Sequence, residues 1–240
     1  MRQNIFDNPS FLKAYLAYRS RGDCPTEKLA WPALQRMLPP LQGLHLLDIG
    51  SGMGEFCLAA SKAGALSVTG IDISAQMCAL AQKNTNAVQN IRLINLPVED
   101  FETRQQTYDL VVSSLSLHYV ESFANVVKRI ASWLRPGGQL IMSINHPFYT
   151  ANLGADGTSA IVDYHLDGPR PHKWFVDGVV KYHRTFETNI RVFQHAELQL
   201  ADLSEVSANS SWKEEQIGQL MPLFVFFKCL KIAGSSQSWR

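Results

Sequence analysis

The chain has 240 residues, of which 46% are hydrophobic, and its formal net charge is +1. This length and apolar content suffice for one domain with a sizeable core. A net charge so close to zero provides no overall field that would attract nucleic acid or an anionic membrane, so we expect neither as a partner. The longest clearly apolar run, residues 221–227, is too short to span a bilayer.

The cysteines give no sign of a disulfide framework or a metal site. The four cysteines, Cys24, Cys57, Cys78 and Cys229, form no CxxC pair. The N-terminus also lacks the apolar core of a signal peptide. We therefore expect reduced structural thiols in a cytoplasmic protein, without a bound metal.

The first forty residues predict two helices, and strands and helices alternate after them. The N-terminal helices are expected at residues 8–19 and 26–38, the second ending at a Pro-Pro pair. Strands are then expected at residues 43–50, 66–72, 91–96, 108–115 and 139–145, with helices at 54–63, 74–87 and 123–134. This alternation predicts an α/β protein with a doubly wound, mainly parallel sheet.

The alternation stops at residues 146–181, which are rich in glycine, proline, histidine and aromatic residues. Long connections of this kind are often lids or binding elements. A helix at 185–196 and strands at 198–206 and 223–232 follow, and the last two strands predict an antiparallel hairpin. We expect one domain with four parts: a helical cap (1–40), a core (41–145), a substrate-covering insert (146–184) and a terminal helix with strands (185–240).

Three glycines at alternate positions follow the first predicted strand in "LLDIGSGMGEF". A dinucleotide, a phosphate or S-adenosylmethionine can each bind such a turn. The dinucleotide fingerprint GxGxxG requires a third glycine where this chain has Glu55, and the Lys-Ser/Thr of a P-loop is missing. Asp72 ends the second strand, where a carboxylate can accept hydrogen bonds from both hydroxyls of a ribose.

Four segments carry a resemblance to a known family. In order and spacing, "LLDIGSGMGEF", "VTGIDIS", "YDLVVSSLSLHYV" and "LRPGGQLIMSINHP" resemble class I S-adenosylmethionine-dependent methyltransferases. The likeness spans about residues 40–146 and is greatest to the small-molecule branch, the type 11 methyltransferase domains related to ubiquinone and menaquinone methyltransferases. It implies a Rossmann-like seven-stranded sheet with an antiparallel last strand. It also implies methyl transfer from S-adenosylmethionine to a small molecule in metabolite or natural-product biosynthesis, with S-adenosylhomocysteine as product and the accepting O, N or C atom undetermined.

The resemblance also implies the cofactor-binding residues. Asp48 would orient the glycine turn or reach the cofactor amine through water, and Asp72 would hold the ribose. Room for the methionine portion and the adenosine would come from the turn itself, formed by Gly50, Ser51, Gly52 and Gly54. Ser114 and Leu115 would face the methionine portion through backbone groups.

The adenine contacts are less regular. Ile73 and Met77 would border the adenine ring, or simply pack between helix and sheet. Many relatives carry an acid after the third strand that accepts the adenine amino group, and Pro97 stands there in this chain. Glu99 or Asp100 would replace that acid, or only the Val98 N–H would contact adenine.

Two residues of the first helix are expected to close over the cofactor. Arg19 would pair with the cofactor carboxylate and Tyr15 would lie beside it. The alternative is a packed tyrosine and a solvated arginine.

Catalysis of methyl transfer requires mainly a well-positioned nucleophile, and an O–H or N–H nucleophile also needs a base. His146, at the end of the fifth strand, is the first candidate for that base, followed by His118 and His183. The alternative in each case is a histidine that is hydrogen-bonded or packed within the fold. Aromatic residues in and near the insert, among them Tyr149, Trp174 and Tyr182, favour an aromatic or apolar small-molecule acceptor.

Two other functions are compatible with the same motifs. The chain would be an enzyme that uses S-adenosylmethionine for a non-methylating reaction, or a non-catalytic partner subunit that retains the cofactor pocket.

Overall fold

A computed structural model describes residues 2–22, 24–86, 88–153, 163–207 and 222–232. Its strands are β1 (His45–Ile49), β2 (Ser67–Asp72), β3 (Ile91–Asn95), β4 (Tyr108–Ser114), β5 (Leu134–Asn145), β6 (Gly168–Trp174), β7 (Val176–His183), β8 (Leu198–Ser207) and β9 (Pro222–Lys231). Its α-helices are α1 (Pro9–Arg19), α2 (Trp31–Met37), α3 (Glu55–Lys62), α4 (Ala75–Asn84), α5 (Phe123–Trp133), α6 (Pro147–Ala151) and α7 (Phe186–His195). Short helical segments lie at Ile5–Asp7, Thr26–Ala30, Val98–Asp100 and Leu117–Tyr119.

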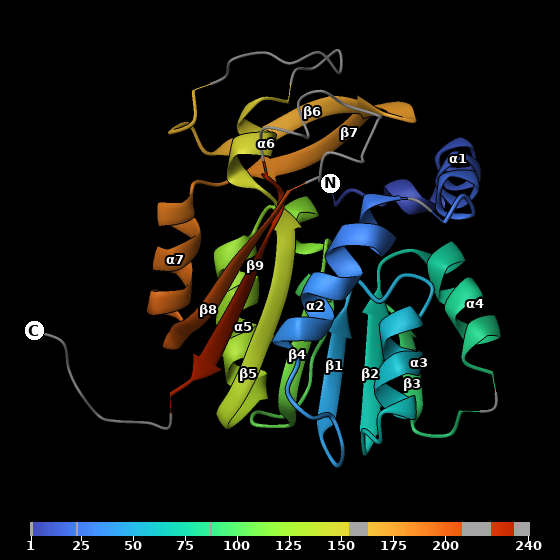
Figure 1. Ribbon diagram of the computed structural model, residues 1–240, viewed down its shortest axis with the longest axis vertical. Helices are drawn as coiled ribbons and strands as arrows, with labels where there is room; N and C mark the ends of the chain where they lie inside the picture. Colours follow the sequence, from blue (N-terminus) through green and yellow to red (C-terminus); the bar gives the residue numbers. More distant parts are fainter. Residues whose placement is uncertain (1, 23, 87, 154–162, 208–221, 233–240) are drawn as a thin grey trace, which may run out of the picture.

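Seven strands form the central sheet in the order β3-β2-β1-β4-β5-β9-β8 (Figure 1). Neighbouring strands among the first five pair in parallel, while β9 runs antiparallel to both of its neighbours, β5 and β8. The predicted, mostly parallel sheet with an antiparallel last strand is therefore confirmed. Strand order reverses between β1 and β4, and open α/β sheets bind ligands beyond the carboxyl ends of the strands at such a switch point.

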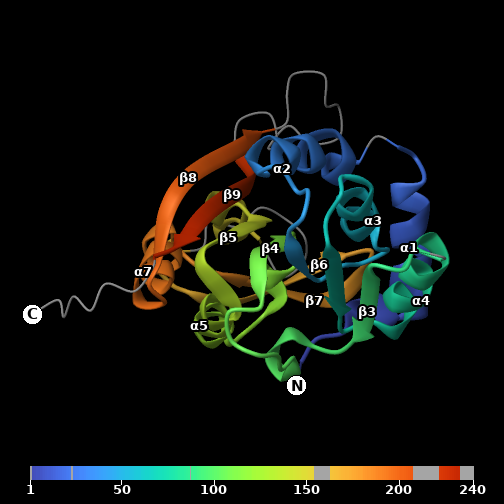
Figure 2. The ribbon, with the colours of Figure 1, turned by 90° about the horizontal axis from the view of Figure 1, so that it is seen from below.

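The sheet is covered on both faces, and neighbouring residues of one strand serve opposite faces. On β1, Leu46 packs into one hydrophobic cluster and Leu47 into the other. Helices α2 and α3 cover the Leu46 face, and α5 and α7 cover the Leu47 face (Figure 2). Because both faces are buried, the strands read as continuous apolar runs in the sequence.

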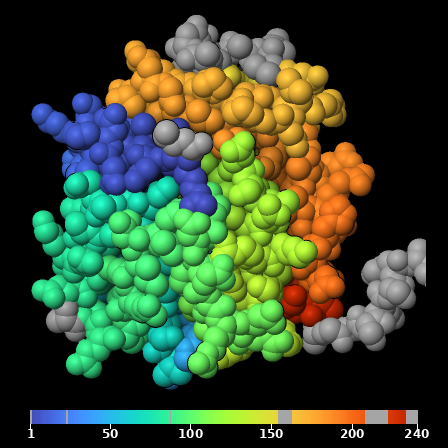
Figure 3. Space-filling view, turned by 180° about the vertical axis from the view of Figure 1, so that it is seen from behind, coloured from blue at the N-terminus to red at the C-terminus, as the bar shows by residue number. Residues whose placement is uncertain are grey.

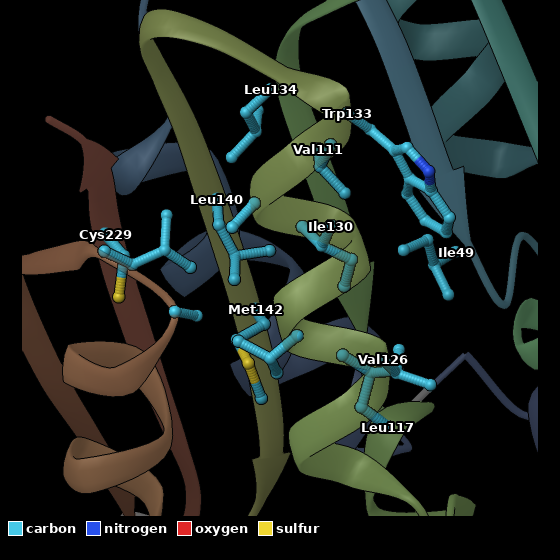
Figure 4. Close-up of a cluster of buried hydrophobic side chains, with 14 of the residues drawn as sticks. Ile49, Val111, Leu117, Val126, Ile130, Trp133, Leu134, Leu140, Met142 and Cys229 are labelled. Carbon is cyan, nitrogen blue, oxygen red and sulfur yellow. The ribbon is translucent and has the colours of Figure 1, made fainter. Parts of the chain in front are cut away.

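Helix α5 follows the spacing expected for one buried face. Val126, Val127 and Ile130 are at most 1% exposed. Figure 4 shows Val126 and Ile130 beside Leu140 and Met142 of β5, all within one cluster. This cluster fixes the position of β5 beneath α5.

The structure differs from most of the expected element boundaries by at most two residues, and the larger shifts in the first two-thirds of the chain are at β5 and α4. β5 begins at Leu134 and not at residue 139, because Leu134 already pairs with Tyr108 of β4. The register then shifts at an irregularity, and regular pairing continues from Leu110 with Gln139. Helix α4 ends at Asn84, and the predicted end near residue 87 lies outside the described residues.

The larger difference is the insert, whose described part holds α6 and the two-stranded sheet of β6 and β7. The alternation of the preceding chain does stop there, but the segment is not irregular, since β6 and β7 pair. No strand was expected because β6 contains Pro169 and Pro171. Proline removes a hydrogen-bond donor and usually argues against a strand, but a two-stranded sheet tolerates it where the N–H is not needed for pairing.

The β6–β7 hairpin packs against the N-terminal segment, and together they lie above the carboxyl ends of the sheet (Figures 1 and 3). The Gln3 side chain donates to the Val180 carbonyl at 3.1 Å and accepts from the Val180 N–H at 2.7 Å. The rings of Phe11 and Trp174 meet edge to face at 5.2 Å. The N-terminal segment and the hairpin thus form one cover over these strand ends.

Within the described residues, none of the helices combines the length and the apolar character needed to cross a membrane.

The Ile130→Ala substitution tests the cluster beneath α5. It should lower the free energy of unfolding by about 2–5 kcal/mol, because it removes fully buried methyl and methylene groups and leaves a cavity. Lys128→Ala, at an exposed position of the same helix, is the matched control and should change it by roughly 0.5 kcal/mol or less. Urea denaturation followed by circular dichroism measures both, and equal effects would contradict this packing.

Candidate active site

A large cavity of about 1040 Å³ lies at the carboxyl ends of β1, β2 and β4. Its floor is formed by the turns that follow these strands. Its other walls come from α1, the segment at Thr26–Ala30 and the β6–β7 hairpin. The cavity therefore occupies the switch point of the sheet, beneath the cover described above.

The glycine turn is held to β2 by backbone hydrogen bonds. The N–H groups of Gly50 and Ser51 both donate to the Ile71 carbonyl, at 2.8 and 3.0 Å. Gly50 has φ +71°, and a Cβ there would lie 2.3 Å from the Cβ of Ser116. A side chain at position 50 would thus be both strained and in collision, which explains the glycine.

The other two glycines serve different purposes. At Gly52 no atom lies within 4 Å of where a Cβ would stand, so the backbone is open to the cavity that it lines. Gly54 does not line the cavity. It precedes α3 with φ +77°, and a Cβ there would meet Ala81 and Thr85 of α4 at 3.1 and 3.2 Å. The expected cofactor contact of Gly54 is replaced by close packing of α3 on α4.

Asp72 connects the glycine turn to α4. One carboxylate oxygen accepts from the Gly52 N–H and the other from the Ser74 N–H, each at 2.8 Å. Burial raises the pKa of Asp72, while these two donors act in the opposite direction. Each oxygen retains a lone pair, and Asp72 lines the cavity.

Asp48 lies deeper, with 3% of its surface exposed. The Cys57 thiol donates to its Oδ2 at 3.3 Å. Burial raises the pKa of Asp48 to about 7, although the thiol hydrogen bond lowers it. The residue lines the cavity beneath the glycine turn.

Most of the other predicted cofactor residues also line the cavity: Ser51, Ile73, Met77, Val98, Glu99, Ser114, Leu115, Tyr15 and Arg19. One backbone group is already used. The Leu115 N–H donates to the carbonyl of Ser143 at 3.0 Å, so it is not directed at a ligand. Pro97 also lines the cavity, at the position where many relatives have an acid.

Arg19 is surrounded by partners from the chain itself. Its guanidinium contacts Glu27 at 3.0 Å, Glu55 at 2.8 Å and the Tyr15 hydroxyl at 3.2 Å. Its side chain is 10% exposed. Arg19 is therefore a buried, paired cation at the cavity wall and not a solvated surface residue.

Of the three candidate histidines, His118 lines the cavity, and the other two are engaged elsewhere. His146 accepts from the Phe148 N–H at 3.1 Å and so caps α6, and its Nε2 donates to Glu205 at 2.7 Å. His183 contacts the Thr150 hydroxyl at 2.7 Å and the Tyr164 carbonyl at 2.8 Å. The geometry of His146 and His183 thus matches the alternative of histidines bonded within the fold.

His118 is 3% exposed, and the Asn145 N–H donates to its Nδ1 at 3.4 Å. That bond assigns the ring proton to Nε2. Burial lowers the pKa of His118 well below 6.5, and the positive charges of Lys181 and Arg184 act in the same direction. The ring is therefore a neutral hydrogen-bond donor at neutral pH.

The cover contributes aromatic and cationic groups to the cavity. Tyr149, Trp174 and Tyr182 line it, as the aromatic content of the insert suggested. The Lys181 ammonium lies 5.1 Å from the Trp174 ring centre and 5.5 Å from that of Tyr149. His172, which sequence reasoning missed, also lines the cavity, and no partner for its buried Nε2 appears among the described residues.

Glu27 and Glu55 were also missed. Glu27 has no distinguishing context in the sequence, whereas Glu55 directly follows the last glycine of the turn, which was a usable signal. Neither the cavity nor the rest of the described chain gathers three or more His, Cys, Asp or Glu side chains that could hold a metal ion.

Comparison with known proteins identifies the family. A family model described as a methyltransferase domain matches residues 47–142. The structure of an S-adenosylmethionine-dependent methyltransferase from Mesorhizobium loti is 31% identical, with a TM-score of 0.74, and the match covers 83% of this chain and 96% of that one. A putative S-adenosylmethionine-dependent methyltransferase from Listeria monocytogenes is 29% identical with a TM-score of 0.75, covering 85% and 96%.

A shorter match is to a ubiquinone biosynthesis O-methyltransferase of Coxiella burnetii. It is 33% identical over 110 residues, which are 45% of this chain and 47% of that protein.

The cavity fits the cofactor of this family, because Gly52 leaves open space against the backbone and Asp72 offers carboxylate oxygens beside it. The chain belongs to the S-adenosylmethionine-dependent methyltransferases and takes S-adenosylmethionine as its methyl donor.

Proposed function

We propose that the protein, working as one domain, methylates a small molecule bound beneath the β6–β7 hairpin, in metabolite or natural-product biosynthesis. The observation that carries this proposal is the extent of the cavity. Its volume of about 1040 Å³ is slightly above the roughly 300–1,000 Å³ range of ligand pockets, which suits a cofactor together with a small acceptor. The name of the Coxiella burnetii relative, a ubiquinone biosynthesis O-methyltransferase, is in keeping with such an acceptor.

We assign the cofactor to the floor of the cavity. Asp72 would accept hydrogen bonds from the ribose, and the open backbone at Gly52 would face the methionine portion. Ile73 and Met77 would border the adenine. The remaining members of the proposed binding set are Asp48, Gly50, Ser51, Val98, Glu99, Ser114, Leu115, Tyr15 and Arg19.

The acceptor would lie between this floor and the cover. Tyr149, Trp174 and Tyr182 supply planar surfaces there, which favour an aromatic or apolar molecule. The bound cofactor supplies an electrophilic methyl group on a sulfonium. Holding an acceptor atom in line with that methyl accounts for most of the catalysis required.

His118 would orient the acceptor. With its proton on Nε2, the ring donates a hydrogen bond and does not take a proton at that atom. The nearby charges of Lys181 and Arg184 favour an oxygen that carries partial or full negative charge. In this proposal His118 binds the acceptor, and the role of general base expected for it from the sequence is not required.

The Asp72→Asn variant tests the ribose assignment. Removing the charge should weaken S-adenosylmethionine binding about 10- to 100-fold, because a hydrogen bond to a charged group is replaced by one to a neutral group. Asp177→Asn, at a carboxylate that is 86% exposed, makes the same charge change away from the cavity and should leave the affinity unchanged. Isothermal titration calorimetry gives both values, and equal affinities of Asp72→Asn and wild type would remove the assignment.

Paired substitutions test the donor role of His118. A glutamine amide reaches the position of Nε2, whereas an asparagine amide reaches that of Nδ1. His118→Asn should therefore lower kcat/KM about tenfold or more and His118→Gln much less, with cofactor affinity nearly constant in both. S-adenosylhomocysteine release in the presence of an acceptor found by screening measures the rates. Full activity of His118→Asn, or a proton on Nδ1 in the ¹⁵N spectrum of the histidine-labelled protein, would contradict the proposal.

A further inference from the structure

Arg19, a cation at the cavity wall, is held by two carboxylates of the chain itself. Glu27 contacts the Arg19 Nε at 3.0 Å, and both oxygens of Glu55 contact Nη2, at 2.9 and 2.8 Å. The Tyr15 hydroxyl accepts from Nη1 at 3.2 Å. All four residues line the cavity.

The cluster has no spare positive charge for a third carboxylate. One guanidinium faces two carboxylates, so the cluster has a net charge of −1 if all three groups are ionised. Burial opposes the charge on Arg19, but Tyr15 and Glu55 outweigh it and raise its pKa, so the guanidinium is ionised at neutral pH. The amino-acid end of S-adenosylmethionine carries a carboxylate, which would be repelled unless one of the two acids gave up its place.

The two acids are not equally easy to displace. The Glu55 side chain is 54% exposed and that of Glu27 is 34% exposed, so Glu55 can turn into solvent at smaller cost. Partly exposed ion pairs of this kind contribute little to stability. Glu55 is also the first residue of α3, directly after the glycine turn, and it lines the cavity.

We propose that Glu55 is an internal ligand of Arg19 that holds α1 against α3 in the free protein and yields Arg19 to the carboxylate of the cofactor. Glu27 and Tyr15 keep the guanidinium in position throughout. Glu55 thus sets the cofactor affinity by competition. This inference rests on the proposed position of the cofactor at the glycine turn.

Two probes separate the carboxylate from the rest of the cofactor. S-adenosylhomocysteine has the carboxylate, and its decarboxylated form retains the adenosine, the thioether and the amine. Glu55→Gln should tighten S-adenosylhomocysteine binding about two- to fivefold without tightening binding of the decarboxylated form. Arg19→Gln should weaken only S-adenosylhomocysteine, by about tenfold, and Glu55→Gln should bring no gain in the Arg19→Gln background.

Glu102→Gln is the matched control. Glu102 pairs with Arg129 at 3.0 Å, is 84% exposed and does not line the cavity. The affinities of the Glu102→Gln variant for both probes should therefore equal those of wild type. Calorimetry on the full-length proteins gives the dissociation constants, and thermal denaturation verifies that each variant is folded.

The outcomes are distinguishable. Unchanged or weaker binding of S-adenosylhomocysteine by Glu55→Gln, with normal wild-type binding, would overturn the competition and leave the cofactor position intact. Equal tightening of both probes would overturn it too, because the effect would not depend on the carboxylate. Failure of the wild-type protein to bind either probe would contradict the cofactor site and this inference together.

Discussion

The carboxylate of Asp72 connects the turn after β1 to the end of β2 and the start of α4. Asp72 is the last residue of β2. Its carboxylate accepts hydrogen bonds from the Gly52 N–H in the turn after β1 and from the Ser74 N–H at the start of α4. The turn can approach β2 this closely because Gly50 has no side chain to collide with Ser116. The floor of the cavity depends on this arrangement, since the open backbone at Gly52 is presented only when the turn is held down.

The cover depends on contacts between the N-terminal segment and the β6–β7 hairpin, which are far apart in the sequence. Gln3 pairs with the backbone of Val180, and Phe11 packs on Trp174, so the N-terminal segment and the β6–β7 hairpin support each other. This arrangement puts α1, with Arg19, beside the glycine turn and puts the aromatic residues of the insert opposite it. One cavity thereby receives a polar floor that suits the cofactor and an aromatic cover that suits an acceptor.

Burial assigns the histidines to different tasks. His146 and His183 use both ring nitrogens within the fold, whereas His118 accepts from a backbone N–H at Nδ1 and lines the cavity. A histidine kept neutral by burial and by neighbouring cations is a poor base at neutral pH, while its ring N–H can still donate a hydrogen bond. Arg19 is likewise held by its partners, since the carboxylates of Glu27 and Glu55 keep this largely buried cation in place at the cavity wall.

The sequence by itself determined the parallel sheet and, through the resemblance, the cofactor, while only the tertiary structure decided which residues of the insert and the N-terminal segment line the cavity. Apolar runs and helix stops are local signals, so the alternating strands and helices and the glycine turn followed from them, and the family followed from the resemblance of four segments to known motifs. Gly54 shows the limit even there, because its packing partners Ala81 and Thr85 belong to another helix. The β6–β7 hairpin, the partners of Arg19 and the position of His118 at the cavity, with His146 bonded elsewhere, were not predictable, since each depends on contacts between residues far apart in the chain. Periodicity and spacing report local conformation, whereas burial and the partner of a hydrogen bond exist only once distant segments have packed together.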